Sequence, residues 1–287
     1  MIQKIKVIKP SLNFPNLSGL LGYLFESYTP VFICGISGSG TTLLSGLLDQ
    51  EYENICCLHE SAICAVPDSP LKMQSVSEYR TIQEYRSKCF LSPKIDKSLV
   101  RKSLLATYRQ YRCKNPNSNV VIDKAPNVHL ARTIPLKEAF PDAKFILVYR
   151  NPVQSIEGLR RKWPLFGNSQ LFEVCSFWKD MHNAFLRDIR GMKSDVFLIS
   201  YEELISNSED SLKNVASKLG MKERKTKKEY NNKPNLQGKG LRNIVNGKIK
   251  VTDNSQNPDE FSLNQTEMDY ISRMLSETYQ KINSFHQ

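Results

Sequence analysis

The sequence has 287 residues, of which 40% are hydrophobic and 24% charged, and its formal net charge is +11. This composition excludes a disordered or fibrous chain and is sufficient for a large buried core. The excess charge is local, because residues 221–250 contain ten lysines and arginines against two glutamates. This segment predicts one surface for an anionic partner rather than a generally cationic protein.

The seven cysteines are odd in number and include no Cys-x-x-Cys pair. This pattern argues against a disulfide framework or a zinc site and is typical of a reducing compartment. No apolar stretch has the length of a membrane span, and residues 1–10 lack the continuous apolar run of a signal peptide. We therefore expect a soluble, cytoplasmic protein, while a chain separated from a Golgi-type anchor would have the same composition.

The strongest local signal in the sequence is VFICGISGSGTTLLSGLL at residues 31–48. Its first four residues predict a buried strand, and its leucines have the spacing of a helix that begins at Thr41. A glycine- and serine-rich turn between strand and helix is typical of a phosphate-binding loop, since glycines admit an anion and the helix N-terminus presents N–H groups to it. The alternative is an ordinary capped turn. The candidate phosphate ligands are Gly35, Ser37, Gly38, Ser39, Gly40, Thr41 and Thr42.

The loop departs from a nucleoside triphosphate site at one position. In the pattern G-x-x-x-x-G-K-[ST] the lysine reaches the β- and γ-phosphates, and here Thr41 replaces that lysine. A triphosphate would lose its main point charge at this site. A ligand with one phosphate flanked by a less charged group would tolerate the change better. The loop therefore favours a phosphate-containing donor other than ATP.

The remaining elements alternate between strands and helices along the chain. Apolar runs predict strands at residues 54–58, 119–123, 144–149 and 196–200. Helical patterns cover residues 96–112, 128–140 with an interruption at Pro135, 171–189, 201–220 in one or two pieces, and 263–285. Residues 62–95 predict irregular structure with at most one helix near 76–90, and residues 221–258 a long basic loop.

This alternation predicts an α/β fold, with a mostly parallel sheet and helices on both of its faces. We expect a single domain over residues 1–287, with its core at about residues 31–220. In such sheets, ligands bind beyond the carboxyl ends of the strands. Those ends carry the phosphate loop and the side chains of His59, Glu60, Lys124, Arg150 and Tyr201. All the candidate chemistry therefore falls on one edge of the predicted sheet.

Each of these side chains has a functional and an ordinary interpretation. Glu60 could take a proton from an attacking hydroxyl, or it is a solvated loop acid, and His59 beside it is more often structural. Lys124 could stabilise a leaving phosphate oxygen, or it pairs with Asp123. Arg150 offers a fork of donors that suits a phosphate, and a buried ion pair is its alternative.

Four segments, taken in order, resemble the sulfotransferase superfamily that uses 3′-phosphoadenosine 5′-phosphosulfate (PAPS), in its Golgi-type and bacterial branch. GISGSGTTLLSGLLD is similar to the 5′-phosphosulfate loop of that family, and VIDKAPN to its lysine-containing segment. FPDAKFILVYRNPVQSI is similar to the 3′-phosphate motif, and LISYEELISNSEDSLKNVASKLG to the later strand and helix. The resemblance implies the P-loop-like sulfotransferase fold with PAPS as sulfonate donor.

The resemblance also implies roles for single residues. Residues 35–42 would hold the 5′-phosphosulfate and Arg150 the 3′-phosphate, while Tyr201 would lie near the nucleotide. Glu60 matches the glutamate base of the tyrosylprotein-type enzymes, with His59 as the reserve candidate, and Lys124 matches the lysine that steadies the transferring group. Lys239 or Arg242 would close over the 3′-phosphate.

Two positions depart from the family pattern. Gly38 replaces the usual loop arginine or lysine, which removes a cation near the sulfonate. Gly158 replaces the serine expected eight residues after the motif arginine, and Ser155 or Arg160 could take its place. The first departure affects the rate of sulfonate transfer and whether the protein can catalyse it. The second departure affects the affinity for PAPS.

The expected reaction is sulfonate transfer to a hydroxyl or amine, with no metal. The acceptor is a carbohydrate, a peptide tyrosine or a small molecule, and the basic segment leans towards an anionic one. Two alternatives stay open, namely a P-loop small-molecule kinase and a non-catalytic polyanion-binding protein. A nucleic-acid partner is not expected, because the sequence contains no motif of a known nucleic-acid-binding module.

Overall fold

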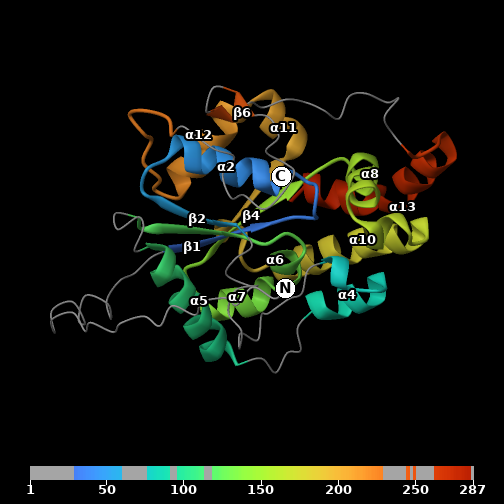
Figure 1. Ribbon diagram of the computed structural model, residues 1–287, viewed down its shortest axis with the longest axis horizontal. Helices are drawn as coiled ribbons and strands as arrows, with labels where there is room; N and C mark the ends of the chain where they lie inside the picture. The colour runs from blue at the N-terminus through green and yellow to red at the C-terminus, as the bar shows by residue number, and fades with distance from the viewer. Residues whose placement is uncertain are drawn as a thin grey trace, which may run out of the picture.

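A computed structural model describes residues 29–59, 76–90, 96–112, 118–228, 244–245, 248–249 and 262–285. Within these residues, five parallel strands form one sheet in the order β2-β3-β1-β4-β5 (Figure 1). The strands are β1 (Thr29–Cys34), β2 (Ile55–His59), β3 (Val120–Lys124), β4 (Lys144–Tyr149) and β5 (Val196–Ser200). The predicted α/β fold class is confirmed, and the predicted strands lie within one or two residues of the observed ones.

Helices cover both faces of this sheet (Figure 1). One face carries α2 (Thr41–Glu51), α11 (Tyr201–Ser206) and α12 (Ser208–Lys218). The other carries α4 (Ile82–Cys89), α5 (Lys97–Arg112), α6 (Val128–Ala131), α7 (Thr133–Ala139), α8 (Pro152–Lys162), α9 (Pro164–Gly167), α10 (Leu171–Asp188) and α13 (Gln265–Asn283). Two short 3₁₀ turns, η1 (Val76–Glu78) and η2 (Lys193–Asp195), and a two-stranded antiparallel pair, β6 (Ile244–Val245) and β7 (Lys248–Ile249), complete the described elements.

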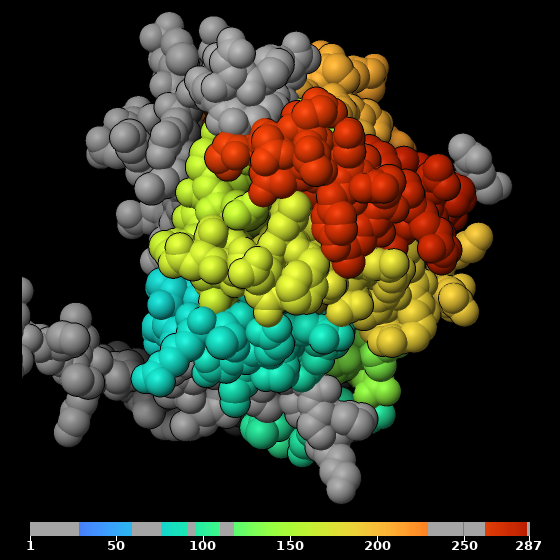
Figure 2. Space-filling model, turned by 90° about the vertical axis from the view of Figure 1, so that its right-hand side faces the viewer, coloured from blue at the N-terminus to red at the C-terminus, as the bar shows by residue number. Residues whose placement is uncertain are grey.

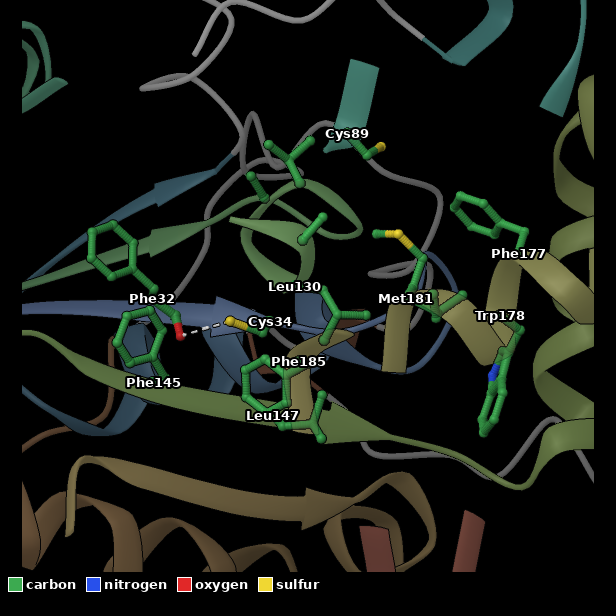
Figure 3. Packing of buried hydrophobic residues seen from close by; sticks show 14 of the residues in the cluster. Phe32, Cys34, Cys89, Leu130, Phe145, Leu147, Phe177, Trp178, Met181 and Phe185 are labelled. Carbon is green, nitrogen blue, oxygen red and sulfur yellow. Dashed lines mark hydrogen bonds between the residues drawn. The ribbon is translucent and has the colours of Figure 1, made fainter. Parts of the chain in front are cut away.

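The alternation of side chains along each strand divides the core into two layers. On β1, Val31 and Ile33 pack on the α2 side, whereas Phe32 and Cys34 pack on the opposite side. The rings of Phe32 and Phe145 stack with centroids 5.5 Å apart, and Figure 3 shows them beside each other on neighbouring strands. The same alternation on β3 sends Asp123 and Lys124 to opposite faces of the sheet.

On the outer side of the second layer, one face of the molecule consists of α4, α13 and, between them, the helices α8, α9 and α10 (Figure 2). Side-chain contacts join α4 to α10, with Gln83 donating to Glu173 at 2.6 Å and Arg86 pairing with Asp180 at 2.9 Å. These two contacts fix α4 against α10.

The structure corrects the predicted interruption of the helix after β3. The break lies at Arg132, between α6 and α7, and Pro135 is inside the first turn of α7. A proline is tolerated there because first-turn N–H groups have no intrahelical partner. The other helix predictions that fall on described residues are confirmed, including two helices between residues 201 and 220.

The basic segment also departs from expectation. Residues 221–258 were expected to be loop throughout, yet β6 and β7 form a short hairpin within them. Residues 222–228 are tied to the C-terminal end of α2, where Lys228 pairs with Asp49 at 2.6 Å and Lys227 with Glu51 at 2.9 Å. Among the described helices, none has the length and apolar character needed to cross a membrane.

Candidate active site

The carboxyl ends of the strands meet at one edge of the sheet, as the parallel arrangement requires. His59 at the end of β2 lies in register with Lys124 at the end of β3. Tyr149 at the end of β4 lies in register with Ser200 at the end of β5, so that Arg150 and Tyr201 follow side by side. The phosphate loop follows β1 in the middle of this edge. The structure thus brings the loop, Lys124, Arg150 and Tyr201 together.

The phosphate loop presents the N-terminus of α2 without a side-chain cap. Gly40 is the N-cap residue and makes no side-chain hydrogen bond to the helix. The first N–H groups of a helix lack intrahelical partners and carry the positive end of its dipole. The hydroxyl of Ser39 is buried beside them, and it has no hydrogen-bond partner among the described residues. An uncapped helix start with an orphaned buried hydroxyl fits a bound anion such as a phosphate.

Lys124 brings a cation to this loop from the neighbouring strand. Its side chain is fully buried, and its Nζ donates to the Thr42 hydroxyl at 3.1 Å. Thr41 occupies the place of a P-loop lysine, but the site still holds an ammonium, supplied from β3. A buried ammonium beside the positive end of a helix creates a strongly positive potential, which favours a bound anion.

Arg150 and Tyr201 border the other side of the loop. The Arg150 Nη1 donates to the Gly38 carbonyl at 3.3 Å, and its guanidinium lies 4.2 Å from the centre of the Tyr201 ring. Its Nε donates to Gln154 at 3.0 Å. The Tyr201 ring packs so closely on Gly40 that a Cβ there would lie 2.6 Å from it. These contacts hold the guanidinium next to the loop.

The two positions that depart from the family pattern lie next to each other in the structure. A Cβ built on Gly38 has one neighbour within 4 Å, the Gly158 carbonyl carbon on α8 at 3.9 Å. Gly38 has a φ of 96°, which favours glycine, so that a lysine or arginine there would be strained. Gly158 is helical, and a Cβ on it would meet nothing within 4 Å. A serine would therefore fit at position 158.

The two substitutes considered for Gly158 have other partners. The Ser155 hydroxyl is buried and accepts a hydrogen bond from Trp178 Nε1 on α10 at 3.1 Å. Arg160 pairs with Glu267 on α13 at 3.3 Å. Of the remaining candidates, Glu60, Lys239 and Arg242 lie outside the described residues, as does the side chain of His59.

Sequence reasoning missed Asn127, which belongs to the VIDKAPN segment. Its side chain is fully buried and makes hydrogen bonds to both the backbone and the hydroxyl of Ser37 in the phosphate loop. Its φ of 65° with a ψ of −49° lies outside the left-handed helical region and is rare for a residue other than glycine. The Pro-Asn pair directly after a strand was the available signal, because that pair marks a tight turn.

Asp123 points away from the loop, into the core on the other face of β3. It accepts a hydrogen bond from Tyr108 at 2.9 Å, and its second oxygen lies 3.7 Å from His129 Nε2. Burial raises the pKa of Asp123 to about 7. Burial also lowers the pKa of His129 to about 3. Near neutral pH His129 is therefore neutral and Asp123 is about half protonated, so that their contact is not a strong ion pair.

The raised pKa of Asp123 predicts a pH-dependent stability difference. Because its folded-state pKa of about 7 exceeds the usual 3.8, wild-type protein loses stability as the pH rises through this interval. Asn cannot ionise, so Asp123→Asn should gain stability relative to wild type between about pH 4 and pH 7, by about 2 kcal/mol or more. Urea unfolding of both proteins at the two pH values measures this change. A pH-independent difference would contradict the raised pKa.

Comparison with known proteins decides the family. The family model described as "Sulfotransferase family" matches residues 30–225. The chain belongs to the sulfotransferase family. This membership confirms the resemblance drawn from the four sequence segments. The matched range contains the phosphate loop, Lys124, Arg150 and Tyr201, and it ends before Lys239 and Arg242.

Solved structures with the same fold include other sulfotransferases. Sulfotransferase STF9 from Mycobacterium avium is 14% identical, with a TM-score of 0.57 over 92% of this sulfotransferase and 80% of that chain. Sulfotransferase STF1 from Mycobacterium tuberculosis H37Rv is 11% identical, with a TM-score of 0.55 over 91% and 80%. No curated protein matches the sequence significantly. At these identities, the likeness supports the fold of this sulfotransferase.

Proposed function

We propose that this sulfotransferase moves the sulfonate group of PAPS to a hydroxyl or amine of an acceptor molecule. One observation carries the proposal: the uncapped start of α2, the buried Ser39 hydroxyl and the buried Lys124 ammonium all meet at the phosphate loop. Each favours an anion at this place, and a single phosphate suits a loop that lacks the P-loop lysine. Family membership favours a sulfonate donor over the ATP of the kinase alternative.

The residues of the site fit the two charged ends of PAPS. The loop over residues 35–42 would hold the 5′-phosphosulfate, with Ser37 and Ser39 acting through their hydroxyls. Arg150, held beside Gly38 and Tyr201, would bind the 3′-phosphate. The donor supplies an activated sulfonate, whose sulfur–oxygen bond to the 5′-phosphate breaks as the bond to the acceptor oxygen or nitrogen forms.

The protein's own contribution to this reaction is charge stabilisation and proton removal. Lys124 and the first N–H groups of α2 would stabilise the negative charge that grows on the departing phosphate oxygen. Glu60 would accept the proton of the attacking group, since it follows β2, whose last residue lies in register with Lys124. No step requires a metal, and within the described residues no three His, Cys, Asp or Glu side chains gather to hold one.

The acceptor is not specified by the described residues. The leaning towards an anionic acceptor rested on the basic segment, whose residues 222–228 lie at the C-terminal end of α2. The phosphate loop lies at the other end of this 11-residue helix, roughly 15 Å away. The proposed acceptor classes are carbohydrates, peptide tyrosines and small molecules, including anionic ones. Labelled sulfonate from PAPS should appear on a member of such a panel, whereas Mg²⁺ and ATP should yield no phosphorylated product.

Gly158→Ser is expected to tighten the binding of the desulfated product, 3′-phosphoadenosine 5′-phosphate (PAP), by about tenfold. Position 158 has open space beside the loop, and a hydroxyl there would add one hydrogen bond to a charged phosphate. Calorimetric titration with PAP measures the affinity. Gly158→Ala is the matched control, because it gains helix propensity without the hydroxyl and should leave the PAP affinity unchanged. Equal tightening in both variants would contradict a phosphate contact.

A further inference from the structure

The Asn127 side chain makes two hydrogen bonds to one residue of the phosphate loop, Ser37. Its Oδ1 accepts from the Ser37 backbone N–H at 3.0 Å, and its Nδ2 donates to the Ser37 hydroxyl at 2.9 Å. Its own backbone N–H donates to the Gly35 carbonyl at 2.7 Å. Three hydrogen bonds from one buried residue therefore hold the first half of the loop.

The second hydrogen of the Asn127 amide connects the loop to α4. Nδ2 donates to the Tyr85 hydroxyl at 2.9 Å, and this hydroxyl is also hydrogen-bonded to the Cys89 thiol. The Tyr85 ring is buried and packs against Phe177 with centroids 5.7 Å apart. An amide whose two N–H groups and oxygen all have fixed partners has only one orientation. Tyr85 therefore sets how the Asn127 amide faces the loop.

Arg132 holds α4 against the same turn by a second, independent contact. Its Nε donates to the Cys89 carbonyl at 3.1 Å, and its Nη2 to the Lys88 carbonyl at 2.7 Å. These carbonyls belong to the last turn of α4, where a cation is favoured by the helix dipole. The segment 127–132 thus joins α4 to the phosphate loop through both of its ends.

This network determines which groups of the loop face a ligand. The N–H of Ser37 is taken by Asn127, and the N–H of Ser39 is taken by the Ile36 carbonyl. Because the Ser37 oxygen already accepts from Asn127, its hydroxyl proton is left to donate to an anion. Anion binding to the loop then requires no rearrangement of Ser37, which is the energetic benefit of preorganisation.

We propose that Asn127 is a positioning residue for the donor, which holds Ser37 in its anion-binding conformation, and that Tyr85 on α4 sets the orientation of the Asn127 amide. The identity of the anion as the phosphosulfate end of PAPS rests on the proposed function. The positioning of the loop by Asn127 does not rest on the proposed function, because these hydrogen bonds lie within the protein itself.

The test uses Asn127→Gly and Tyr85→Phe, with Tyr108→Phe as the matched control. Glycine tolerates the φ of 65° at position 127, so the variant removes the amide without straining the backbone. Tyr108→Phe deletes an equally buried hydroxyl whose partner is Asp123 rather than Asn127. Two quantities are measured in the full chain: hydrogen exchange of the peptide over residues 35–43 without ligand, and the Kd of PAP.

We expect faster exchange of the loop peptide in both Asn127→Gly and Tyr85→Phe, but not in Tyr108→Phe. PAP binding should weaken by about tenfold in Asn127→Gly and by about threefold in Tyr85→Phe. Suppose that loop exchange is faster in both variants but that the wild-type protein does not bind PAP. This result would support the positioning role and refute PAPS as the donor. Unchanged loop exchange in both variants, or equal effects in the Tyr108→Phe control, would overturn the positioning role.

Discussion

Lys124→Met is expected to lower the rate of PAP release from PAPS by about a hundredfold or more. The Lys124 ammonium is buried, and it reaches the loop at Thr42, where the N-terminus of α2 also points. A preformed cation in a site shielded from water stabilises developing charge far more than one in solvent. Methionine keeps the length and the apolar stem of the side chain, so that the change removes the ammonium charge together with its hydrogen bond to Thr42. The rate is measured as single-turnover release of PAP from PAPS. The acceptor is water or a hydroxyl compound identified with the acceptor panel.

The control for this experiment is Lys137→Met. Lys137 is half-buried and pairs with Asp195 at 2.7 Å, away from the loop, so its loss should leave the rate unchanged. Thermal unfolding of both variants separates a rate effect from misfolding. A Lys124→Met protein that is folded and releases PAP at the wild-type rate would remove Lys124 from the catalytic machinery.

Arg150→Ala is expected to weaken PAP binding by about a hundredfold, and the binding of adenosine 5′-monophosphate (AMP) much less. The Arg150 guanidinium is held next to the loop by the Gly38 carbonyl, Gln154 and the Tyr201 ring. If it binds the 3′-phosphate, its removal matters only for a ligand that carries this group. AMP lacks the 3′-phosphate and otherwise resembles PAP. Calorimetric titration with the two nucleotides measures the difference.

Arg160→Ala serves as the matched control for Arg150→Ala, because Arg160 is the other arginine considered for the 3′-phosphate. It pairs with Glu267 on α13 and should leave both affinities unchanged. Equal losses of PAP and AMP in Arg150→Ala would show that Arg150 supports the loop in general. Loss of PAP binding in Arg160→Ala instead would transfer the 3′-phosphate role to Arg160.

The fold was predictable because its signals are local. A strand buried on both faces needs a continuous apolar run, and residues 144–149 have one in the sequence and form β4 in the structure. The alternation of strands and helices then predicted parallel pairing. Parallel pairing places the carboxyl ends of all the strands at the same edge of the sheet. The break at Arg132 was missed because a proline is disruptive inside a helix but harmless in its first turn.

The contacts within the site depend on three dimensions and were less predictable. Gly38 and Gly158 are distant in sequence, yet a Cβ on Gly38 would lie 3.9 Å from the Gly158 carbonyl carbon on α8. Asp123 and Lys124 are sequence neighbours, yet strand alternation gives them different partners, Tyr108 and Thr42. Asn127 was missed because its role depends on hydrogen bonds to Ser37, which is ninety residues away in the sequence.

The central claim is that the phosphate loop and Arg150 form a site for a nucleotide with a 5′-phosphate and a 3′-phosphate. Calorimetric titration of the wild-type protein with PAP, AMP and ATP, each with and without Mg²⁺, tests it most directly. The claim predicts that PAP binds more tightly than AMP and ATP and that its affinity is the same without the metal. No binding of PAP, together with Mg²⁺-dependent binding of ATP, would contradict it and favour the kinase alternative.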